Sequence, residues 1–244
     1  MNRNVMVTGM VLTAMPIGEY DKRITLLTLE RGKITAFARG ARRPNSQLLA
    51  ACNPFSFGQF EVYEGRTSYN VVRAEISSHF TEVTGSLDAT YYGFYFLEMA
   101  DYFAQENGDE REMLKLLYQS LRALSDSRYD KQLVRAIFEL KMLVLQGIYP
   151  NMFSCQKCGK KEELQFFSLQ RAGMVCRDCR EGENGRRLDG STIYTMQYII
   201  ATEISKLFTF AVSAEVLKEL TEVLEAYRNK YVAHNFKSEQ FLDI

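Results

Sequence analysis

The sequence has no net charge, very little histidine and no long hydrophobic run. Among 244 residues there are 30 basic and 30 acidic side chains, and no uninterrupted apolar stretch approaches the ~18 residues that a membrane span requires. The first residues lack the apolar run and small-residue cleavage site that are typical of a secretion signal. We therefore expect a globular cytoplasmic protein that is not attached to a membrane.

The sequence also lacks the common motifs of enzymes. Neither the G-x-x-x-x-G-K-[ST] phosphate loop nor G-x-G-x-x-G is present, so nothing supports a nucleotide cofactor. The two histidines, His79 and His234, belong to no metal-binding or triad pattern, and serine-nucleophile signatures are missing. These absences predict a protein that is not an enzyme.

Short β-rich segments fill the first 80 residues. Hydrophobic patterning and turn signals predict antiparallel strands at residues 5–14, 23–30, 33–40, 55–65 and 68–77. Five such strands fit a small closed barrel of the OB type, although another small barrel or a sandwich has the same pattern. We expect an OB-fold nucleic-acid-binding domain over residues 1–80.

After residue 80 the hydrophobic pattern becomes helical. It predicts helices at 86–105, 109–124, 130–147, 191–208 and 213–235. Aromatic residues crowd the first of these, and their helical spacing within an acidic segment favours core packing over a base-stacking surface. The predicted class is α+β, with the five-stranded OB barrel followed by a helical domain over residues 81–244.

Four of the five cysteines form two C-x-x-C pairs that are separated by 17 residues. This spacing is typical of a zinc ribbon, because each C-x-x-C turn directs two sulfurs at one side of a tetrahedron. The predicted ligands of one structural Zn²⁺ are Cys155, Cys158, Cys176 and Cys179. They lie in a zinc module that we expect to be inserted at residues 151–190.

A structural role for this metal is favoured over a catalytic one. Four cysteines fill the coordination shell, whereas a catalytic zinc keeps one position open for water or substrate. The H-x-E motif of the zinc deaminases is also absent. A redox dithiol, a pair of disulfides and a site that has lost its metal remain alternatives.

Positive charge is concentrated near the beginning of the chain. Residues 1–43 hold eight basic and three acidic side chains, and three arginines lie within "RGARRPNS", residues 39–46. On a strand over residues 33–40, alternate side chains would form a cationic face with an aromatic ring in its middle. OB folds hold single strands in grooves that combine cations with aromatic rings. The candidate nucleic-acid contacts are Lys22, Arg23, Lys33, Phe37, Arg39, Arg42 and Arg43.

Such an interface would recognise charge rather than sequence. Neutralising about five phosphates of a single strand gives a slope of log affinity against log salt of roughly −3.5. The alternative is a solvated hairpin rim that binds nothing.

One stretch resembles a known family. "VLTAMPIGEYDKRITLLTLERGKITAFARGARRPNS", residues 11–46, is similar to the N-terminal barrel of the bacterial recombination-mediator family RecO. The matching elements include Gly18-Glu19-x-Asp21, Gly32-Lys33 and the run from Ala38 to Arg43, and the similarity continues through residues 53–75. The order of barrel, helices, four-cysteine module and helices is also RecO-like.

The resemblance implies a DNA repair and recombination mediator. RecO-like proteins bind single- and double-stranded DNA, anneal complementary strands and work with RecR. They also contact the single-strand DNA-binding protein and help RecA to replace it on DNA. Two other hypotheses stay open from the residues themselves: an RNA-binding or transcription-associated OB/zinc-ribbon protein, and a zinc- or thiol-dependent enzyme.

Overall fold

The computed structural model describes residues 4–66, 68–182 and 184–242, and the chain divides into two compact units. Unit 1 comprises Met1–Asp126 and Phe236–Ile244, and unit 2 comprises Ser127–Asn235. The last barrel strand ends at Ser78, close to the predicted boundary at residue 80. The helices that follow it nevertheless group with the barrel in unit 1, so the division at residue 80 stays a prediction.

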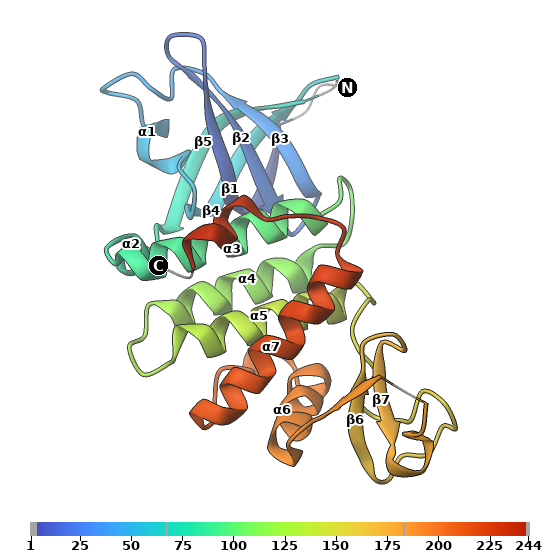
Figure 1. The fold of residues 1–244 in the computed structure, drawn as a ribbon. Coiled ribbons are helices and arrows are strands. Elements are labelled where there is room, and N and C mark those ends of the chain that lie inside the picture. Colours follow the sequence, from blue (N-terminus) through green and yellow to red (C-terminus); the bar gives the residue numbers. More distant parts are fainter. Residues whose placement is uncertain (1–3, 67, 183, 243–244) are drawn as a thin grey trace. The chain divides into compact units, whose positions relative to one another are not determined.

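Five strands of unit 1 close into a barrel (Figure 1). They are β1 (Asn4–Ile17), β2 (Asp21–Thr28), β3 (Gly32–Ala38), β4 (Phe57–Glu64) and β5 (Tyr69–Ser78), in the order β1-β2-β3-β5-β4. The predicted OB-like barrel is therefore confirmed. One detail of the prediction is wrong, because β3 and β5 pair in parallel. An odd number of strands in a closed ring cannot all be antiparallel to both neighbours.

Inward-facing aliphatic side chains fill the barrel. Along β3 the residues alternate between buried and half-buried, which is the period of two expected for a strand with one face in a core. The short helix α1 (Leu48–Ala51) contributes Leu48 to the same cluster, and Cys52 follows it. Cys52 is fully buried in this cluster, where a cysteine packs as a small apolar side chain.

Three further helices belong to unit 1. They are α2 (Thr81–Thr84), α3 (Leu87–Phe103) and α4 (Arg111–Leu124). Tyr92, Tyr95 and Phe96 of α3 are buried, which confirms that much of the aromatic run is core. Ser86 occupies the N-cap position of α3, but its side chain makes no capping hydrogen bond.

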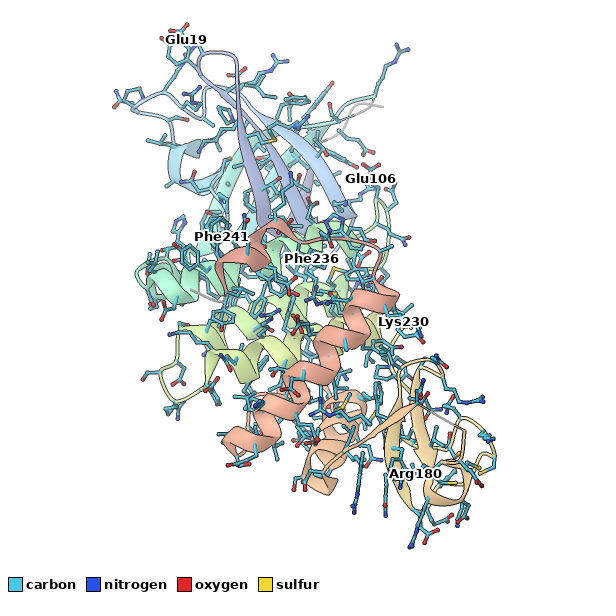
Figure 2. All side chains as sticks on the ribbon, viewed as in Figure 1. Glu19, Glu106, Arg180, Lys230, Phe236 and Phe241 are labelled. Carbon is cyan, nitrogen blue, oxygen red and sulfur yellow. The ribbon has the colours of Figure 1, made fainter. Side chains whose placement is uncertain are left out.

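The C-terminal segment of unit 1 folds back onto α3. Its short helix η3 (Lys237–Phe241) begins where the Glu98 carboxylate accepts hydrogen bonds from the backbone amides of Lys237 and Ser238, both at 2.9 Å. Phe236 and Phe241 both lie along α3 (Figure 2). The aromatic surface of α3 is thus partly covered by residues from the far end of the chain.

Unit 2 combines three helices with a small sheet. The helices are α5 (Lys131–Leu145), α6 (Gly190–Ala201) and α7 (Ala214–Tyr231), with short turns η1 (Arg177–Cys179) and η2 (Ile204–Lys206). The strands β6 (Leu164–Ser168), β7 (Gly173–Cys176) and β8 (Gly185–Arg187) form a sheet in the order β7-β6-β8. No helix in the described part of the chain is both long and apolar enough to cross a membrane.

Helix α6 is shorter than predicted. It ends at Ala201, seven residues before the predicted end, and Thr202 adopts an extended conformation with ψ 143°. The buried Lys141 of α5 explains this stop: its ammonium group donates to the carbonyls of Ile199, Ile200 and Thr202 at 3.3, 3.0 and 2.6 Å. These carbonyls lie at the end of the helix, where they have no partner within it.

Candidate nucleic-acid interface and metal centre

The loop that follows β3 presents three arginines to solvent. Arg39, Arg42 and Arg43 are exposed, whereas Ala41 between them is fully buried in the barrel core. Gly40 has φ +65°, a left-handed conformation that glycine adopts without strain. The buried alanine fixes the loop to the barrel, and the neighbouring side chains therefore point outward. We call residues 39–43 the arginine loop.

The turn between β1 and β2 supports the arginine loop from beside it. The Arg42 backbone amide donates to the Tyr20 carbonyl at 2.8 Å, and the Gly40 amide donates to Asp21 Oδ1 at 2.7 Å. The guanidinium carbon of Arg43 lies 5.3 Å from the centre of the Tyr20 ring. Two segments that are about 20 residues apart in sequence therefore form one surface.

The arginine side chains are available to an anion. Within residues 4–66, 68–182 and 184–242, no carboxylate lies within salt-bridge distance of Arg39, Arg42 or Arg43. Arg42 does donate one hydrogen bond to the Gly18 carbonyl at 3.3 Å. Each guanidinium carries five N–H donors in a fork that matches a phosphate, so most donors stay unused.

The predicted alternation along β3 is confirmed. Lys33, Thr35 and Phe37 are half-buried on the outer face, and Ile34, Ala36 and Ala38 are buried inside the barrel. Arg39 itself lies just beyond the strand, in the first turn of the arginine loop.

Phe37 has a cation beside it. Its register partner on β2 is Arg23, which is exposed, and the partner of Arg23 on β1 is Met15. Directly opposite residues of neighbouring strands have Cβ atoms about 5 Å apart. A cation, an aromatic ring and an exposed thioether therefore lie in one row on the outer face of the barrel.

Lys33 lies at the other end of β3, facing α3. Its ammonium group donates to the Asp101 carbonyl at 2.6 Å and lies 3.5 Å from the Asp101 carboxylate. Six residues along a strand place it about 20 Å from Arg39. The structure therefore does not bring Lys33 together with the arginine loop.

The ammonium group of Lys22 already has hydrogen-bond acceptors within unit 1. Its ammonium group donates to the carbonyls of Leu49 and Cys52 and, at 2.6 Å, to Asn53 Oδ1. Partial burial lowers the pKa of Lys22, and the charge of Arg42 contributes to the shift. Its hydrogen bonds link β2 to the segment after the arginine loop, so its direct contact with DNA remains only a prediction.

Tyr20 is a candidate contact that the sequence analysis missed. Tyr20 is 41% exposed, and its ring lies under the guanidinium of Arg43. A single tyrosine in a turn carries no sequence signal of its own. Only the pairing of the two loops shows that it belongs with the arginines.

The four predicted metal ligands come together in unit 2. The sulfur atoms of Cys155, Cys158, Cys176 and Cys179 all lie within 4.8 Å of one another. Cys176 ends β7, Cys179 ends the turn η1, and the first pair lies in the loop before β6. Together they can hold a metal ion.

The geometry of the sulfurs fits a metal better than a disulfide. A tetrahedral site with metal–sulfur distances of about 2.3 Å places its sulfurs about 3.8 Å apart. The Cys158 and Cys176 sulfurs, one from each C-x-x-C pair, are 3.7 Å apart. A disulfide would need about 2.05 Å, and all four cysteines are free thiols.

Local hydrogen bonds prepare one sulfur for coordination. Burial opposes ionisation of Cys155, but hydrogen bonds from the backbones of Cys176, Cys158 and Lys157 outweigh it and lower the pKa of this thiol to about 6. The thiolate is the form that binds a metal.

The metal-binding module has a very small hydrophobic core. Besides the cysteines, the cluster contains Phe166 and Val175, with Leu164 packed against it. On the surface of the module, Lys160 Nζ lies 2.9 Å from the Glu163 carboxylate and 3.2 Å from the Asp178 carboxylate. So few apolar contacts do not stabilise a small module on their own, which is the usual reason for a structural metal.

Comparison with known proteins gives one consistent result. Residues 1–80 match the family model described as "Recombination protein O N terminal", and residues 85–240 match "Recombination protein O C terminal". The chain is 30% identical over 238 residues to the DNA repair protein RecO of Acetivibrio thermocellus, covering 96% of this chain and 94% of that protein.

Two further relatives carry the same name. The RecO protein of Caldicellulosiruptor saccharolyticus is 32% identical over 225 residues, which cover 92% of this chain and 90% of the relative. That of Bacillus subtilis is 29% identical over 236 residues, which cover 96% and 92%.

Proposed function

Because the chain belongs to the RecO family of DNA repair proteins, we propose that it binds single- and double-stranded DNA and anneals complementary strands. We further propose that it helps to load RecA onto DNA covered by the single-strand DNA-binding protein. RecR and the single-strand DNA-binding protein are the partners that the family implies, and RecA is an indirect one. The place of action would be the bacterial cytoplasm, at the nucleoid.

The observation that carries this proposal is the exposed arginine loop. Arg39, Arg42 and Arg43 extend from one edge of an OB-like barrel without carboxylate partners among the described residues. Phosphate contacts by arginine supply most of the affinity of sequence-independent DNA binding. Single and double strands both present phosphates, so one surface serves for both.

Aromatic rings near the loop favour single strands with unstacked bases. Tyr20 and Phe37 lie beside Arg43 and Arg23 respectively. Every base has a π-face, so stacking on such rings adds affinity without selecting a sequence. The arrangement supports broad recognition of single-stranded DNA.

Annealing follows from charge alone and needs no nucleotide and no catalytic step. Two complementary strands repel each other through their phosphates. A cationic surface that binds both backbones reduces this repulsion until base pairs form, and pairing then supplies the free energy. The proposed protein is therefore a mediator rather than an enzyme.

The metal site would hold one structural Zn²⁺. Four cysteines and no other ligand type are typical of closed zinc sites, in which the ion stabilises the fold. When bound, the ion would join the two C-x-x-C turns and so hold η1 against β6 and β7. The residues of this site take no part in DNA binding under this proposal.

An annealing assay tests the proposal. Two complementary labelled strands are mixed with and without this protein, and duplex formation is followed by energy transfer. The strands are either bare or covered by the single-strand DNA-binding protein. We expect faster annealing in both cases, without any nucleotide. Equal rates with and without the protein would refute the proposal, and tighter binding of RNA than DNA in a competition assay would favour the RNA-binding alternative.

A further inference from the structure

An acidic residue lies inside the proposed cationic interface. Asp21 begins β2, directly beside the arginine loop, in a surface that is proposed to bind phosphate. Its charge should repel DNA. Yet Asp21 Oδ1 lies 2.7 Å from the backbone nitrogen of Gly40, and it is not within salt-bridge distance of any arginine of the loop in the described structure. Its carboxylate is therefore directed at the backbone rather than at the cations.

The hydrogen bond is made at the point where the arginine loop leaves the barrel. Gly40 has φ +65°, and the chain turns there between the end of β3 and Ala41. A carboxylate that accepts from a backbone amide makes a charge-assisted hydrogen bond, which is stronger than a neutral one. Asp21 thus holds Gly40, the second residue of the loop, in a conformation that directs the following arginines outward.

Two other hydrogen bonds connect the same pair of segments, and in both of them the acceptor is a backbone carbonyl. The Tyr20 carbonyl accepts from the Arg42 amide, and the Gly18 carbonyl accepts from the Arg42 side chain. Asp21 alone contributes a side-chain acceptor to this set of three. It is therefore the member that a point mutation can remove without changing an arginine of the loop.

Building on the proposed function, we infer that Asp21 is a positioning residue that orders the arginine loop for DNA. A loop that is already ordered loses less conformational entropy when it binds. The benefit of fixing Arg42 and Arg43 then outweighs the repulsion from one carboxylate. Simple electrostatics predicts that removing a negative charge from the interface strengthens DNA binding. The positioning role of Asp21 predicts the opposite change in affinity: its removal should weaken DNA binding.

The test compares three variants, each of which removes one negative charge. Asp21→Ala removes both the charge and the acceptor, and Asp21→Asn removes the charge but keeps an oxygen that can accept from Gly40. Glu19→Ala is the matched control, since Glu19 lies at the tip of the same hairpin (Figure 2) and makes no hydrogen bond or ion pair with another described residue. Affinity for labelled oligo-dT is measured by fluorescence anisotropy over a series of salt concentrations.

We expect Asp21→Ala to bind about three- to tenfold more weakly, with a salt slope shallower by about 0.7, as for the loss of one phosphate contact. Asp21→Asn should stay within about twofold of the parent. Glu19→Ala should bind equally or up to about twofold more tightly, as expected when one screened charge is removed. Should Asp21→Ala not fold, Asp21→Ser replaces it, because a serine hydroxyl is too short to reach Gly40.

Equal or tighter binding by Asp21→Ala, or an equal loss in Asp21→Asn, would overturn the inference. The same titrations include the variant that lacks all three loop arginines. If that variant binds like the parent, the proposed DNA interface itself is wrong. If it loses affinity while Asp21→Ala does not, only the positioning role of Asp21 is refuted.

Discussion

Replacing Arg39, Arg42 and Arg43 together by alanine should weaken single-stranded DNA binding roughly 100-fold at about 0.1 M salt. The structure sets this magnitude. The single ammonium groups of Lys22 and Lys33 already donate to protein acceptors. The guanidinium groups of Arg23 and the three loop arginines have no carboxylate partner among the described residues, and most of their donors stay unused although Arg42 donates to Gly18 and Arg23 to Met15 Sδ. We therefore count four phosphate contacts. Four phosphate contacts give a salt slope of about −2.8, shallower than the −3.5 that five contacts would give.

Removing three of these contacts leaves a slope of about −0.7. With equal affinities at about 1 M salt, where phosphate contacts contribute least, the difference of about 2.1 in slope makes the variant bind about 100-fold more weakly at about 0.1 M. The fold should tolerate the change, because the guanidinium groups are exposed. Their contacts are one hydrogen bond from Arg42 and one stacked pair of Arg43 with Tyr20. Each contributes about 1 kcal/mol or less to stability.

The assay is the anisotropy titration of labelled oligo-dT between about 0.05 and 0.3 M salt, the range over which phosphate contacts dominate affinity. A matched control removes three exposed arginines elsewhere in unit 1, Arg73, Arg111 and Arg122, and so makes the same change in net charge. We expect the control to stay within about threefold of the parent, because distant surface charges are screened. A folded loop variant with the affinity and salt slope of the parent would refute the reasoning, as would an equal loss in the control.

Two other predictions concern unit 2. Metal analysis should find one Zn²⁺ per chain. Chelation should make residues 151–190 sensitive to protease, because the ion stabilises a module with a small core. The affinity for DNA should change by no more than about twofold, because the ion stabilises that module alone. Unchanged protease resistance after complete removal of the metal would contradict this. Lys141→Met should lower the free energy of unfolding by about 2–4 kcal/mol, because two buried carbonyls and one part-buried carbonyl lose a charged donor. Urea denaturation measures the loss, with the exposed Lys218→Met as control, and a change below about 0.5 kcal/mol would show that water replaces the ammonium group.

The parts of the fold that depend on short-range pattern were predictable. Alternation along residues 33–38 is a property of any strand with one buried face, so the outward position of Phe37 and the inward position of Ala36 followed from their spacing. The cysteine site was predictable for a similar reason. A C-x-x-C turn places two sulfurs together by local geometry, and the chain contains only two such turns.

Other features depend on partners that the local pattern does not identify. The early end of α6 is set by Lys141, about 60 residues earlier in the chain. The parallel pairing of β3 with β5 follows from closing an odd number of strands. The basic residues of β2 and β3 looked equivalent in sequence, but Lys33 is paired with Asp101 on α3.

Composition, spacing and periodicity were thus enough to identify a barrel with exposed arginines, a helical remainder and a cluster of four sulfurs that can hold a metal, because each depends on residues close together in the chain. Tertiary structure alone decided which cations keep unused donors, and it placed Tyr20 and Asp21 beside the arginine loop. The physical reason is that a charge is used or left available according to the donors and acceptors that folding brings within about 3 Å of it. That proximity is a property of the whole fold rather than of any short segment.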